Sequence, residues 1–167
     1  MDLEQLNALS VDRAVDELTG CCGSSRWARE MAARRPFRSV DELLLDADVV
    51  FESLGPPDWL EAFAAHPRIG DRPAPSASPS AVWSAAEQSG VTDASRAVFG
   101  RRNRDYESRF GHTFIICASG RTGDEMLKIL EERMLNNPED ESRQAAREQR
   151  QITRLRLGKL LAGRLQP

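Results

Sequence analysis

The sequence has few of the residues that build metal sites, disulfide frameworks or nucleic-acid surfaces. Its 167 residues include three cysteines and two histidines, and the formal net charge is −3. Binding to polyanions depends on many Lys and Arg contacts to phosphates, so a negative net charge argues against it. We therefore expect no nucleic-acid partner.

The cysteines and histidines that are present do not form the patterns of metal or disulfide chemistry. Cys21, Cys22 and Cys117 are odd in number and contain no CxxC pair, which argues against a zinc tetrad or a secreted disulfide framework. His66 and His112 belong to no HxH or HExxH motif. A Gly-rich phosphate loop and a G-x-S-x-G motif are also missing. We expect reduced thiols and no metal.

Long apolar runs are absent as well. No uninterrupted apolar stretch approaches the roughly 18 residues of a membrane span, and residues 1–4 lack the basic start and apolar run of a signal peptide. Together with reduced thiols, these absences lead us to expect a soluble protein in the cytoplasm with no membrane partner.

Helical patterns separated by ordinary start and stop residues fill most of the chain. A length of 167 residues fits one domain, since single cores commonly take about 100 to 200 residues. We therefore predict an all-α fold, a single compact multi-helix domain over residues 1–167. Predicted helices begin at Ser10, at Ser24 or Ser25, at Ser39, near Asp58, near Val82, near Asp93, at Thr122 and at Asn137.

Capping residues and glycines set the predicted helix boundaries. Ser39–Glu42 and Thr122–Glu125 have the spacing of capping boxes, in which two side chains satisfy amides at the helix start. Helices are expected to end near Gly20, near Gly90 and, for the last helix, near Gly163.

Two segments break the helical pattern. Residues 70–80 are rich in Pro and small residues, which predicts a surface loop. Residues 114–118 are apolar throughout, rich in branched side chains and bounded by Gly111 and Gly120. This pattern predicts a short, buried, extended segment.

His66 is a candidate for proton transfer because histidine changes its charge near neutral pH. The residue before a proline is driven out of the α region, so Pro67 should end the preceding helix near His66 and place the imidazole at the edge of a loop. An imidazole can equally cap a helix C-terminus, where its partial positive charge stabilises the helix dipole. The spacing alone leaves both roles open.

A group of polar residues lies on one side of a predicted helix. Ser84, Glu87 and Gln88 are at positions i, i+3 and i+4, so they could converge on one small polar ligand. Trp83 shares that side, and an aromatic neighbour can exclude water and raise the pKa of a carboxyl group. The pattern by itself favours a blander alternative, a solvated helix face with Trp83 as a core anchor.

Arg156 falls within the apolar stripe of the last predicted helix, four residues from both Ile152 and Leu160. An inward guanidinium is costly unless it meets an anion or a set of acceptors, so Arg156 is a candidate ligand for a carboxylate. A structural ion pair, or an arginine that extends to the surface at the stripe's edge, would explain the same spacing. Arg154 instead lies beside Arg150, away from the stripe.

His112 and Thr113 form a rival catalytic candidate. We favour a surface histidine next to a glycine as the interpretation of His112. The Cys21-Cys22 pair is more typical of core packing than of a nucleophile, since no histidine lies nearby in the sequence.

Taken together, these motifs resemble the family of 2-oxo-4-hydroxy-4-carboxy-5-ureidoimidazoline (OHCU) decarboxylases of ureide metabolism. The resemblance covers nearly the whole chain, and its most specific part is HPRIG (66–70) followed by SAAEQ (84–88). His112-Thr113 departs from the family pattern, in which a more apolar or proline-containing pair is expected. The further matching segments are Leu6-Asn7, Trp27 with Met31, Arg35-Pro36-Phe37, Phe110-Gly111, Phe114-Ile115-Ile116, Glu139 to Glu141 and Ile152 to Leu157.

The resemblance implies an all-helical, homodimeric carboxy-lyase that needs no metal or organic cofactor and converts a ureidoimidazoline substrate to (S)-allantoin during urate degradation. The alternative function is a non-catalytic helical binding or adaptor module, and the histidine spacing disfavours metal-dependent hydrolysis. By the resemblance, the catalytic pair is His66 and Glu87, and the substrate contacts are Pro67, Ser84, Gln88, Phe114, Ile115, Ile116 and Arg156.

Overall fold

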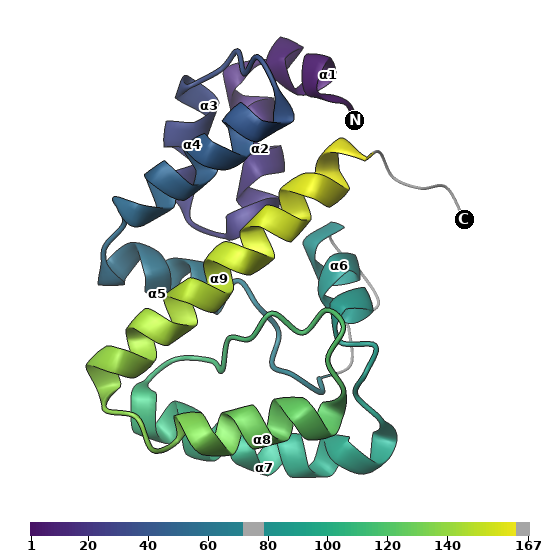
Figure 1. Ribbon diagram of the computed structural model, residues 1–167, viewed down its shortest axis with the longest axis vertical. Helices are drawn as coiled ribbons and strands as arrows, with labels where there is room; N and C mark the ends of the chain where they lie inside the picture. The colour runs from purple at the N-terminus through teal and green to yellow at the C-terminus, as the bar shows by residue number, and fades with distance from the viewer. Residues whose placement is uncertain (72–78, 163–167) are drawn as a thin grey trace. The chain divides into compact units, whose positions relative to one another are not determined.

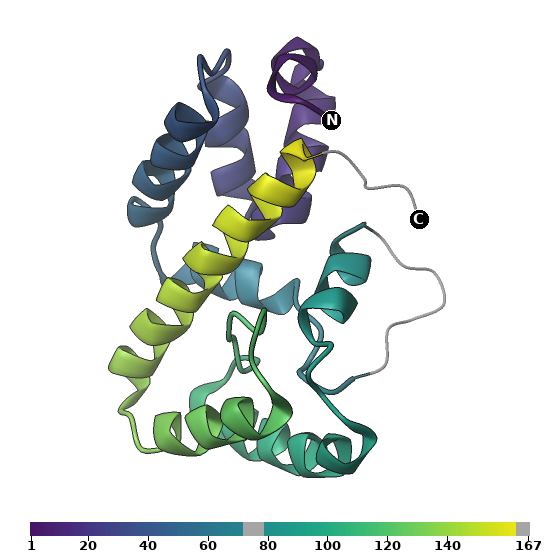
Figure 2. The same cartoon turned by 45° about the vertical axis from the view of Figure 1, so that its right-hand side comes forward.

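The computed structural model describes residues 1–71 and 79–162, and every regular element within these ranges is an α-helix (Figures 1 and 2). The predicted all-α class is therefore confirmed. The chain forms two compact units, one of Met1–Ala62 with the chain from Arg150 onward, the other of Phe63–Gln149. No helix among the described residues is long and apolar enough to cross a membrane.

The first unit is built mainly from helices of the N-terminal third of the chain. These are α1 (Leu3–Ala8), α2 (Val11–Cys22), α3 (Ser25–Ala33), α4 (Val40–Glu52), most of α5 (Pro56–Ala64) and the second half of α9 (Pro138–Leu161). Their inner faces carry large apolar side chains, whose burial supplies the main favourable free energy of folding. Prominent buried members are Leu6, Leu18, Trp27, Met31, Leu43, Val50, Phe51 and Leu157.

Serine caps start three of these helices as predicted. The hydroxyl oxygens of Ser10, Ser24 and Ser39 each accept a hydrogen bond from an amide in the first turn of the helix that follows. At Ser39 only half of the expected capping box forms. In a complete capping box the carboxylate of Glu42 would accept from the Ser39 amide. It accepts instead from the amide and side chain of the preceding residue, Arg38.

The predicted end of α2 near Gly20 is wrong by two residues. The helix continues to Cys22 and ends at Gly23, which has φ = 86° and takes the left-handed conformation of a helix C-cap. The additional residues Cys21 and Cys22 are both buried. Burial of this last turn outweighs the weak helix preference of one internal glycine.

The short helix α1 was not predicted, and contacts distant in the sequence fix it. Asp2 and Gln5 form a complete capping box at its start. Asn7 exchanges two hydrogen bonds with the Phe37 backbone, at 2.8 and 2.9 Å, and the Arg35 guanidinium donates to two carbonyls at the end of α1. A helix of six residues is stabilised mainly by such tertiary contacts.

The second unit contains α6 (Pro79–Glu87), α7 (Asp93–Phe110), α8 (Gly123–Arg133) and the first half of α9. Helices α7 and α8 lie side by side in both views (Figures 1 and 2). Residues 113–118 form neither helix nor strand, and Phe114 to Ala118 are buried, as expected for this segment. The core of the unit contains Ile69, Val91, Phe99, Tyr106, Phe114, Ile116, Ala118, Met126 and Leu130.

Helix boundaries in the rest of the chain follow the predicted capping residues closely. Thr122 and Glu125 form a complete capping box, and Pro138 occupies the first position of α9. Helix α5 starts at Pro56, two residues before the predicted position, because proline is well suited to a first helical turn. Of the predicted 70–80 loop, residues 72–78 lie outside the described residues, and residues 79 and 80 belong to α6, which starts at Pro79 rather than near Val82. Gly163, at the predicted end of α9, also lies outside the described residues.

Two glycines should respond oppositely to replacement by alanine. A Cβ at Gly90 would lie 2.2 Å from the carbonyl oxygen of Arg121, whereas a Cβ at Gly20, inside α2, meets nothing within 4 Å. We expect Gly90→Ala to destabilise the fold by about 1–3 kcal/mol through overpacking, and Gly20→Ala to stabilise it by about 0.5–1 kcal/mol. Thermal unfolding measures both changes, and a melting temperature of Gly90→Ala at or above that of the parent chain would contradict this packing.

Candidate active site

Most of the predicted site residues belong to the second unit. The HPRIG turn (66–70), the end of α6 and the 114–116 segment are all part of it, while Arg156 belongs to the first unit.

His66 lies at the helix-to-loop boundary that Pro67 predicted. Helix α5 ends at Ala64, and the His66 amide donates to the Phe63 carbonyl at 3.1 Å in a last tight turn. The His66 residue is half-buried and its Nε2 atom is withdrawn from solvent, whereas Pro67 is exposed. Bulk water is therefore held back from Nε2, while the residue as a whole remains partly exposed.

Helix α7 holds the turn that follows His66. The guanidinium of Arg68 donates to both carboxylate oxygens of Glu107, at 2.7 and 2.6 Å, in a bidentate pair. The buried Asn103 side chain donates to the carbonyl of Ile69 at 2.9 Å, and Ile69 itself is part of the core. These contacts fix the exit path of the chain from His66.

Gln88 joins the two motifs of the predicted site. The Gly70 amide donates to Oε1 of Gln88 at 2.9 Å, and the Gly70 carbonyl accepts from Arg96 at 2.8 Å. Gly70 has φ = 90°, and a Cβ there would lie 3.2 Å from Phe99, so glycine suits the position both conformationally and sterically. The hydrogen bond ties the end of HPRIG to the end of SAAEQ.

The polar side of α6 is largely withdrawn from water. Ser84 is only 4% exposed, and Glu87 and Gln88 are half-buried at the C-terminal end of the helix. Trp83 is also half-buried. The alternative of a fully solvated helix face is therefore wrong, and the role of Ser84, Glu87 and Gln88 in binding a ligand stays a prediction.

The 114–118 segment lies close to Glu87. Burial raises the pKa of the Cys117 thiol, and the neighbouring carboxylates of Glu148 and Glu87 raise it further. The Cys117 amide donates to Glu148 at 2.8 Å, and its carbonyl accepts from Arg121 at 3.1 Å. Glu87, at the end of α6, therefore lies within electrostatic range of Cys117, the residue that follows the predicted substrate-binding backbone.

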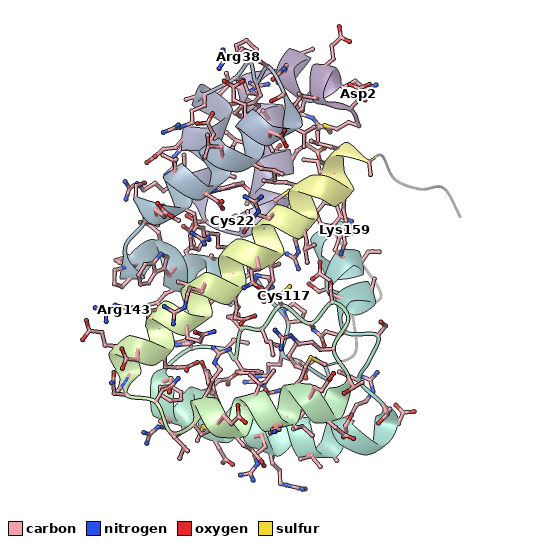
Figure 3. All side chains as sticks on the ribbon, viewed as in Figure 1. Asp2, Cys22, Arg38, Cys117, Arg143 and Lys159 are labelled. Atoms are coloured by element: carbon pink, nitrogen blue, oxygen red, sulfur yellow. The ribbon has the colours of Figure 1, made fainter. Side chains whose placement is uncertain are left out.

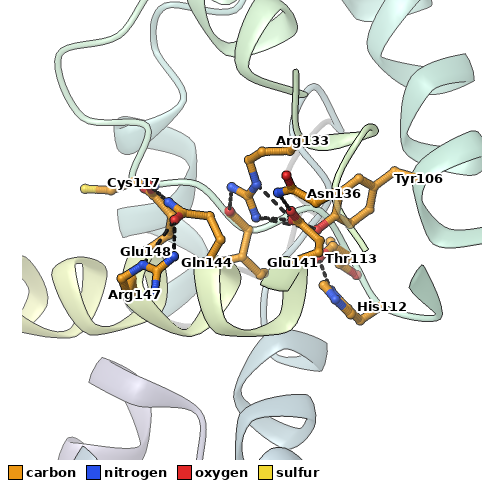
Figure 4. A network of polar contacts seen from close by, with 11 residues as sticks. Tyr106, His112, Thr113, Cys117, Arg133, Asn136, Glu141, Gln144, Arg147 and Glu148 are labelled. Atoms are coloured by element: carbon orange, nitrogen blue, oxygen red, sulfur yellow. Dashed lines mark hydrogen bonds and ion pairs between the residues drawn. The ribbon is translucent and has the colours of Figure 1, made fainter. Parts of the chain in front are cut away.

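The sequence did not predict a buried polar cluster that contacts the 114–118 segment (Figure 4). Its members are Tyr106, Arg133, Asn136 and Glu141. Arg133 donates to Glu141 at 2.8 and 2.5 Å, Asn136 donates to the other Glu141 oxygen at 2.7 Å, and the Tyr106 hydroxyl also donates to Glu141. Arg133 further donates to the Ile115 carbonyl at 2.7 Å. Burial is the main cause that raises the pKa of Tyr106, so the phenol stays protonated as a donor.

One sequence feature could have revealed the cluster. Arg133 follows Met126 and Leu130 at intervals of four and three residues, which places it on the buried stripe of α8. Arg156 was recognised from this same type of spacing. The acidic partner, Glu141, carries no comparable signal because acids are common in a first helical turn.

His112 is buried rather than on the surface, so the favoured interpretation of this residue is wrong. Gly111 ends α7 in the left-handed conformation and turns the chain back, leaving His112 only 9% exposed. Its ring lies 5.1 Å from that of Phe63 and 5.5 Å from that of Tyr106. Nδ1 lies 3.0 Å from the Thr113 carbonyl and donates to it. The imidazole therefore packs as an aromatic side chain.

Arg156 points inward as predicted. It is 3% exposed, which excludes the alternative of a side chain that extends to the surface, and the ion-pair alternative stays open. Its charge acts on the adjacent buried thiols of Cys21 and Cys22. Arg154, by contrast, is half-exposed and pairs with Asp48 at 2.7 Å.

The three cysteines lie in the interior of the protein. All three are buried and none forms a disulfide; Cys22 and Cys117 are labelled in Figure 3. Burial raises the pKa of Cys21 to about 12 and that of Cys22 to about 11, so these thiols are protonated at neutral pH and suit core packing rather than nucleophilic attack. Within residues 1–71 and 79–162, no group of three or more His, Cys, Asp or Glu side chains could hold a metal ion.

A family model and several known proteins match the sequence over most of its length. A family model described as OHCU decarboxylase matches residues 7–158. The uric acid degradation bifunctional protein TTL of Arabidopsis thaliana is 43% identical over 159 residues, which cover 92% of this chain and 49% of that protein. The chain thus spans about half of that relative. The 2-oxo-4-hydroxy-4-carboxy-5-ureidoimidazoline decarboxylase of Haloferax volcanii is 30% identical over 158 residues, covering 94% of both chains.

Two solved structures share the fold. A crystal structure of OHCU decarboxylase in the presence of (S)-allantoin matches with a TM-score of 0.77 and 39% identity, over 88% of this chain and 98% of that chain. A crystal structure of (S)-allantoin synthase matches with a TM-score of 0.70 and 20% identity, over 96% of this chain and 54% of that chain. The second likeness concerns the fold alone.

The buried Cys21 thiol predicts a loss of stability in alkaline solution. Burial raises its pKa from 9.0 to about 12, against a lowering effect of Arg156. The protonated thiol favours the folded state over the unfolded state. This contribution to stability is fully present below the thiol pKa of the unfolded chain and is lost as the pH rises toward the thiol pKa of the folded chain. We expect the free energy of unfolding to fall above about pH 9, and to fall less steeply in Cys21→Ala. Denaturant titrations across this pH range measure both slopes, and equal slopes would contradict the assignment.

Proposed function

Because this chain belongs to the OHCU decarboxylase family, we propose that it catalyses the decarboxylation of OHCU to (S)-allantoin, with His66 and Glu87 as its catalytic pair. The observation that carries the proposal is the junction of the two motifs in the second unit, where Gly70 of HPRIG donates to Gln88 of SAAEQ. The proximity of Glu87 to Cys117 adds the third predicted element to the same unit.

The reaction itself needs only proton transfers and a stabilised electron pair. The bond breaks between the carboxylate and the ring carbon that also bears the hydroxyl, CO2 leaves, and the electron pair moves into the adjacent imine to form an enol. The hydroxyl then loses its proton and becomes the carbonyl of allantoin, while the neighbouring ring carbon, which bears the ureido group, and the imine nitrogen each gain a proton. Overall the substrate anion takes up one proton and loses CO2. Acid–base side chains and a site that orients the ring are therefore sufficient.

His66 and Glu87 are proposed to move the protons. An imidazole can accept and return a proton near neutral pH, and a positioned carboxylate can hold it in the productive orientation. The half-buried positions of both residues support this role, because limited water strengthens electrostatic interactions with the reacting anion. Delivery of the proton to one face of the ring would set the (S) configuration of the product.

The remaining residues are proposed to orient the substrate. Pro67 borders the imidazole, Ser84 offers a buried hydroxyl, and the backbone of residues 114–116 supplies peptide groups. Oε1 of Gln88 already accepts from Gly70, so a contact with substrate would fall to its amide nitrogen, a donor.

Arg156 is proposed as the cationic ligand of the substrate carboxylate. The inward position of Arg156 supports this role. The helical spacing predicted that position, and the side chain is in fact only 3% exposed. A guanidinium can bind a carboxylate through two parallel hydrogen bonds. This role belongs to the proposal that residues 1–167 act as one OHCU decarboxylase-like domain.

We further propose a homodimer located in the cytoplasm, without a resident cofactor. The family resemblance supports the dimer, and the reduced, buried cysteines support a reducing compartment. Membership of the family favours this enzyme over the adaptor module. Light scattering of the purified chain measures its oligomeric state.

Replacement of His66 tests the proposed proton transfer. We expect His66→Asn to lower kcat by about 10²–10⁴-fold, the range of general acid–base catalysis, with little change in melting temperature. His112→Phe is the matched control: it removes the other imidazole from a pocket of aromatic rings and should keep the activity. Allantoin formation from freshly generated OHCU is followed by circular dichroism. A folded His66→Asn variant with parental kcat would reject the role.

Replacement of Arg156 tests the proposed carboxylate contact. A charge-assisted hydrogen bond contributes about 1.5–3 kcal/mol, so Arg156→Gln should weaken binding of anionic substrate analogues by roughly 10- to 100-fold. Arg154→Gln, on the exposed side of the same helix, should leave the affinity unchanged. Calorimetric titration measures both, and a parental affinity in folded Arg156→Gln would remove Arg156 from the site.

A further inference from the structure

The 113–118 segment depends on side chains for its backbone hydrogen bonds. Residues 114–118 of it are buried, and the segment belongs to no helix or strand, so its peptide groups lack the partners that regular structure provides. Buried peptide groups that stay unpaired cost free energy comparable to a lost hydrogen bond. Two buried charged side chains, one from α8 and one from α9, supply such partners.

Arg133 on α8 holds the first of these peptide groups. Its Nη1 donates to the Ile115 carbonyl at 2.7 Å, and its guanidinium lies 4.7 Å from the centre of the Phe114 ring. Glu141, which is 0% exposed, binds the opposite side of the guanidinium. The arginine is therefore locked between a carboxylate and the segment, with little freedom to swing away.

Glu148 on α9 holds the second peptide group. It is 6% exposed, and one carboxylate oxygen accepts from the Cys117 amide at 2.8 Å. Its other oxygen accepts from the Gln144 side chain at 3.2 Å, one turn earlier on the same helix. The carboxylate is thereby fixed in place (Figure 4).

These two contacts fix both peptide planes that flank Ile116. In a planar trans peptide the carbonyl and the N–H point in opposite directions. Because the Ile115 carbonyl points to Arg133, the amide of Ile116 points away from Arg133. Because the Cys117 amide points to Glu148, the carbonyl of Ile116 points away from Glu148. Neither polar group of Ile116 is directed at the side chain that anchors its peptide plane.

We propose that Arg133 and Glu148 are positioning residues that lock the peptide planes on either side of Ile116 and so aim its backbone N–H and carbonyl at the substrate. The inference rests on the proposed function, in which this backbone binds the ureidoimidazoline ring. It assigns a role to two charged residues that lie outside the proposed catalytic and substrate-binding set.

The position of Cys117 supports a link between Glu148 and the catalytic carboxylate. Glu148 and Glu87 both lie close enough to the Cys117 thiol to influence its protonation. The peptide plane that Glu148 holds therefore belongs to a residue within electrostatic range of Glu87 at the end of α6. A small displacement of this plane would change the distance between the Ile116 backbone and groups on α6. The orientation of a bound substrate ring depends strongly on such distances.

The test compares three substitutions at Glu148 with a control on the same helix. Glu148→Ala removes the acceptor, Glu148→Asp keeps the charge but retracts the acceptor by one methylene, and Glu148→Gln keeps an oxygen that can accept from Cys117. Glu139→Gln removes an exposed charge that pairs with Arg143. All variants are assayed for KM and kcat with freshly generated OHCU and for Kd with (S)-allantoin.

We expect KM and Kd to rise at least tenfold in Glu148→Ala and Glu148→Asp. Glu148→Gln should stay within about threefold of the parent chain, and Glu139→Gln should match it. Hydrogen exchange of the 113–118 peptide should accelerate in the first two variants only. Glu148→Asp keeps the test decisive should Glu148→Ala fold poorly.

Two different results would overturn the inference. An active parent chain whose folded Glu148→Ala and Glu148→Asp variants keep parental KM and Kd would show that Glu148 contributes to stability alone, and would leave the proposed function intact. A parent chain that neither turns over OHCU nor binds (S)-allantoin would reject the proposed function, and the positioning role with it.

Discussion

In a helical protein, the peptide groups of buried non-helical segments need hydrogen-bond partners outside the helix backbone. In the second unit, side chains provide these partners. The turn after His66 is held by Asn103, Arg96 and Gln88. The buried 113–118 segment is held by Arg133, Glu148 and Arg121. Both segments are irregular, yet each is anchored to rigid helices. Irregular backbone fixed in this way can present peptide groups to a ligand, which a helix interior cannot do because its peptide groups bond to each other.

The anchors are mostly charged, and this has an energetic consequence. A buried ion pair such as Arg133 with Glu141 recovers the cost of desolvation only when further hydrogen bonds complete it. Here Tyr106, Asn136 and the Ile115 carbonyl complete it. Loss of one member of such a pair typically costs about 3–5 kcal/mol, since the other charge is left buried. The cluster therefore ties the conformation of the 113–118 segment to the integrity of the second unit's core.

Local signals predicted much of the helical framework and several site positions. These signals are the serine and threonine caps, the proline after His66 and the inward spacing of Arg156. Each depends on neighbours within a few residues, so it can be recognised in a single sequence. The missed features are set by distant contacts. Helix α1 depends on Arg35 and Phe37, the burial of His112 depends on rings from α5 and α7, and Glu141 finds its arginine eight residues away on another helix. Family resemblance named the 114–116 backbone as a binding element but not the residues that hold it.

We propose that the motifs held together in the second unit belong to an enzyme that decarboxylates OHCU. The most direct measurement generates the labile intermediate from urate in a cuvette, adds the purified chain, and follows the circular dichroism of the allantoin that forms. We expect rapid growth of the (S)-allantoin signal in proportion to the protein added. A rate and an optical signal equal to those of spontaneous decay would contradict it.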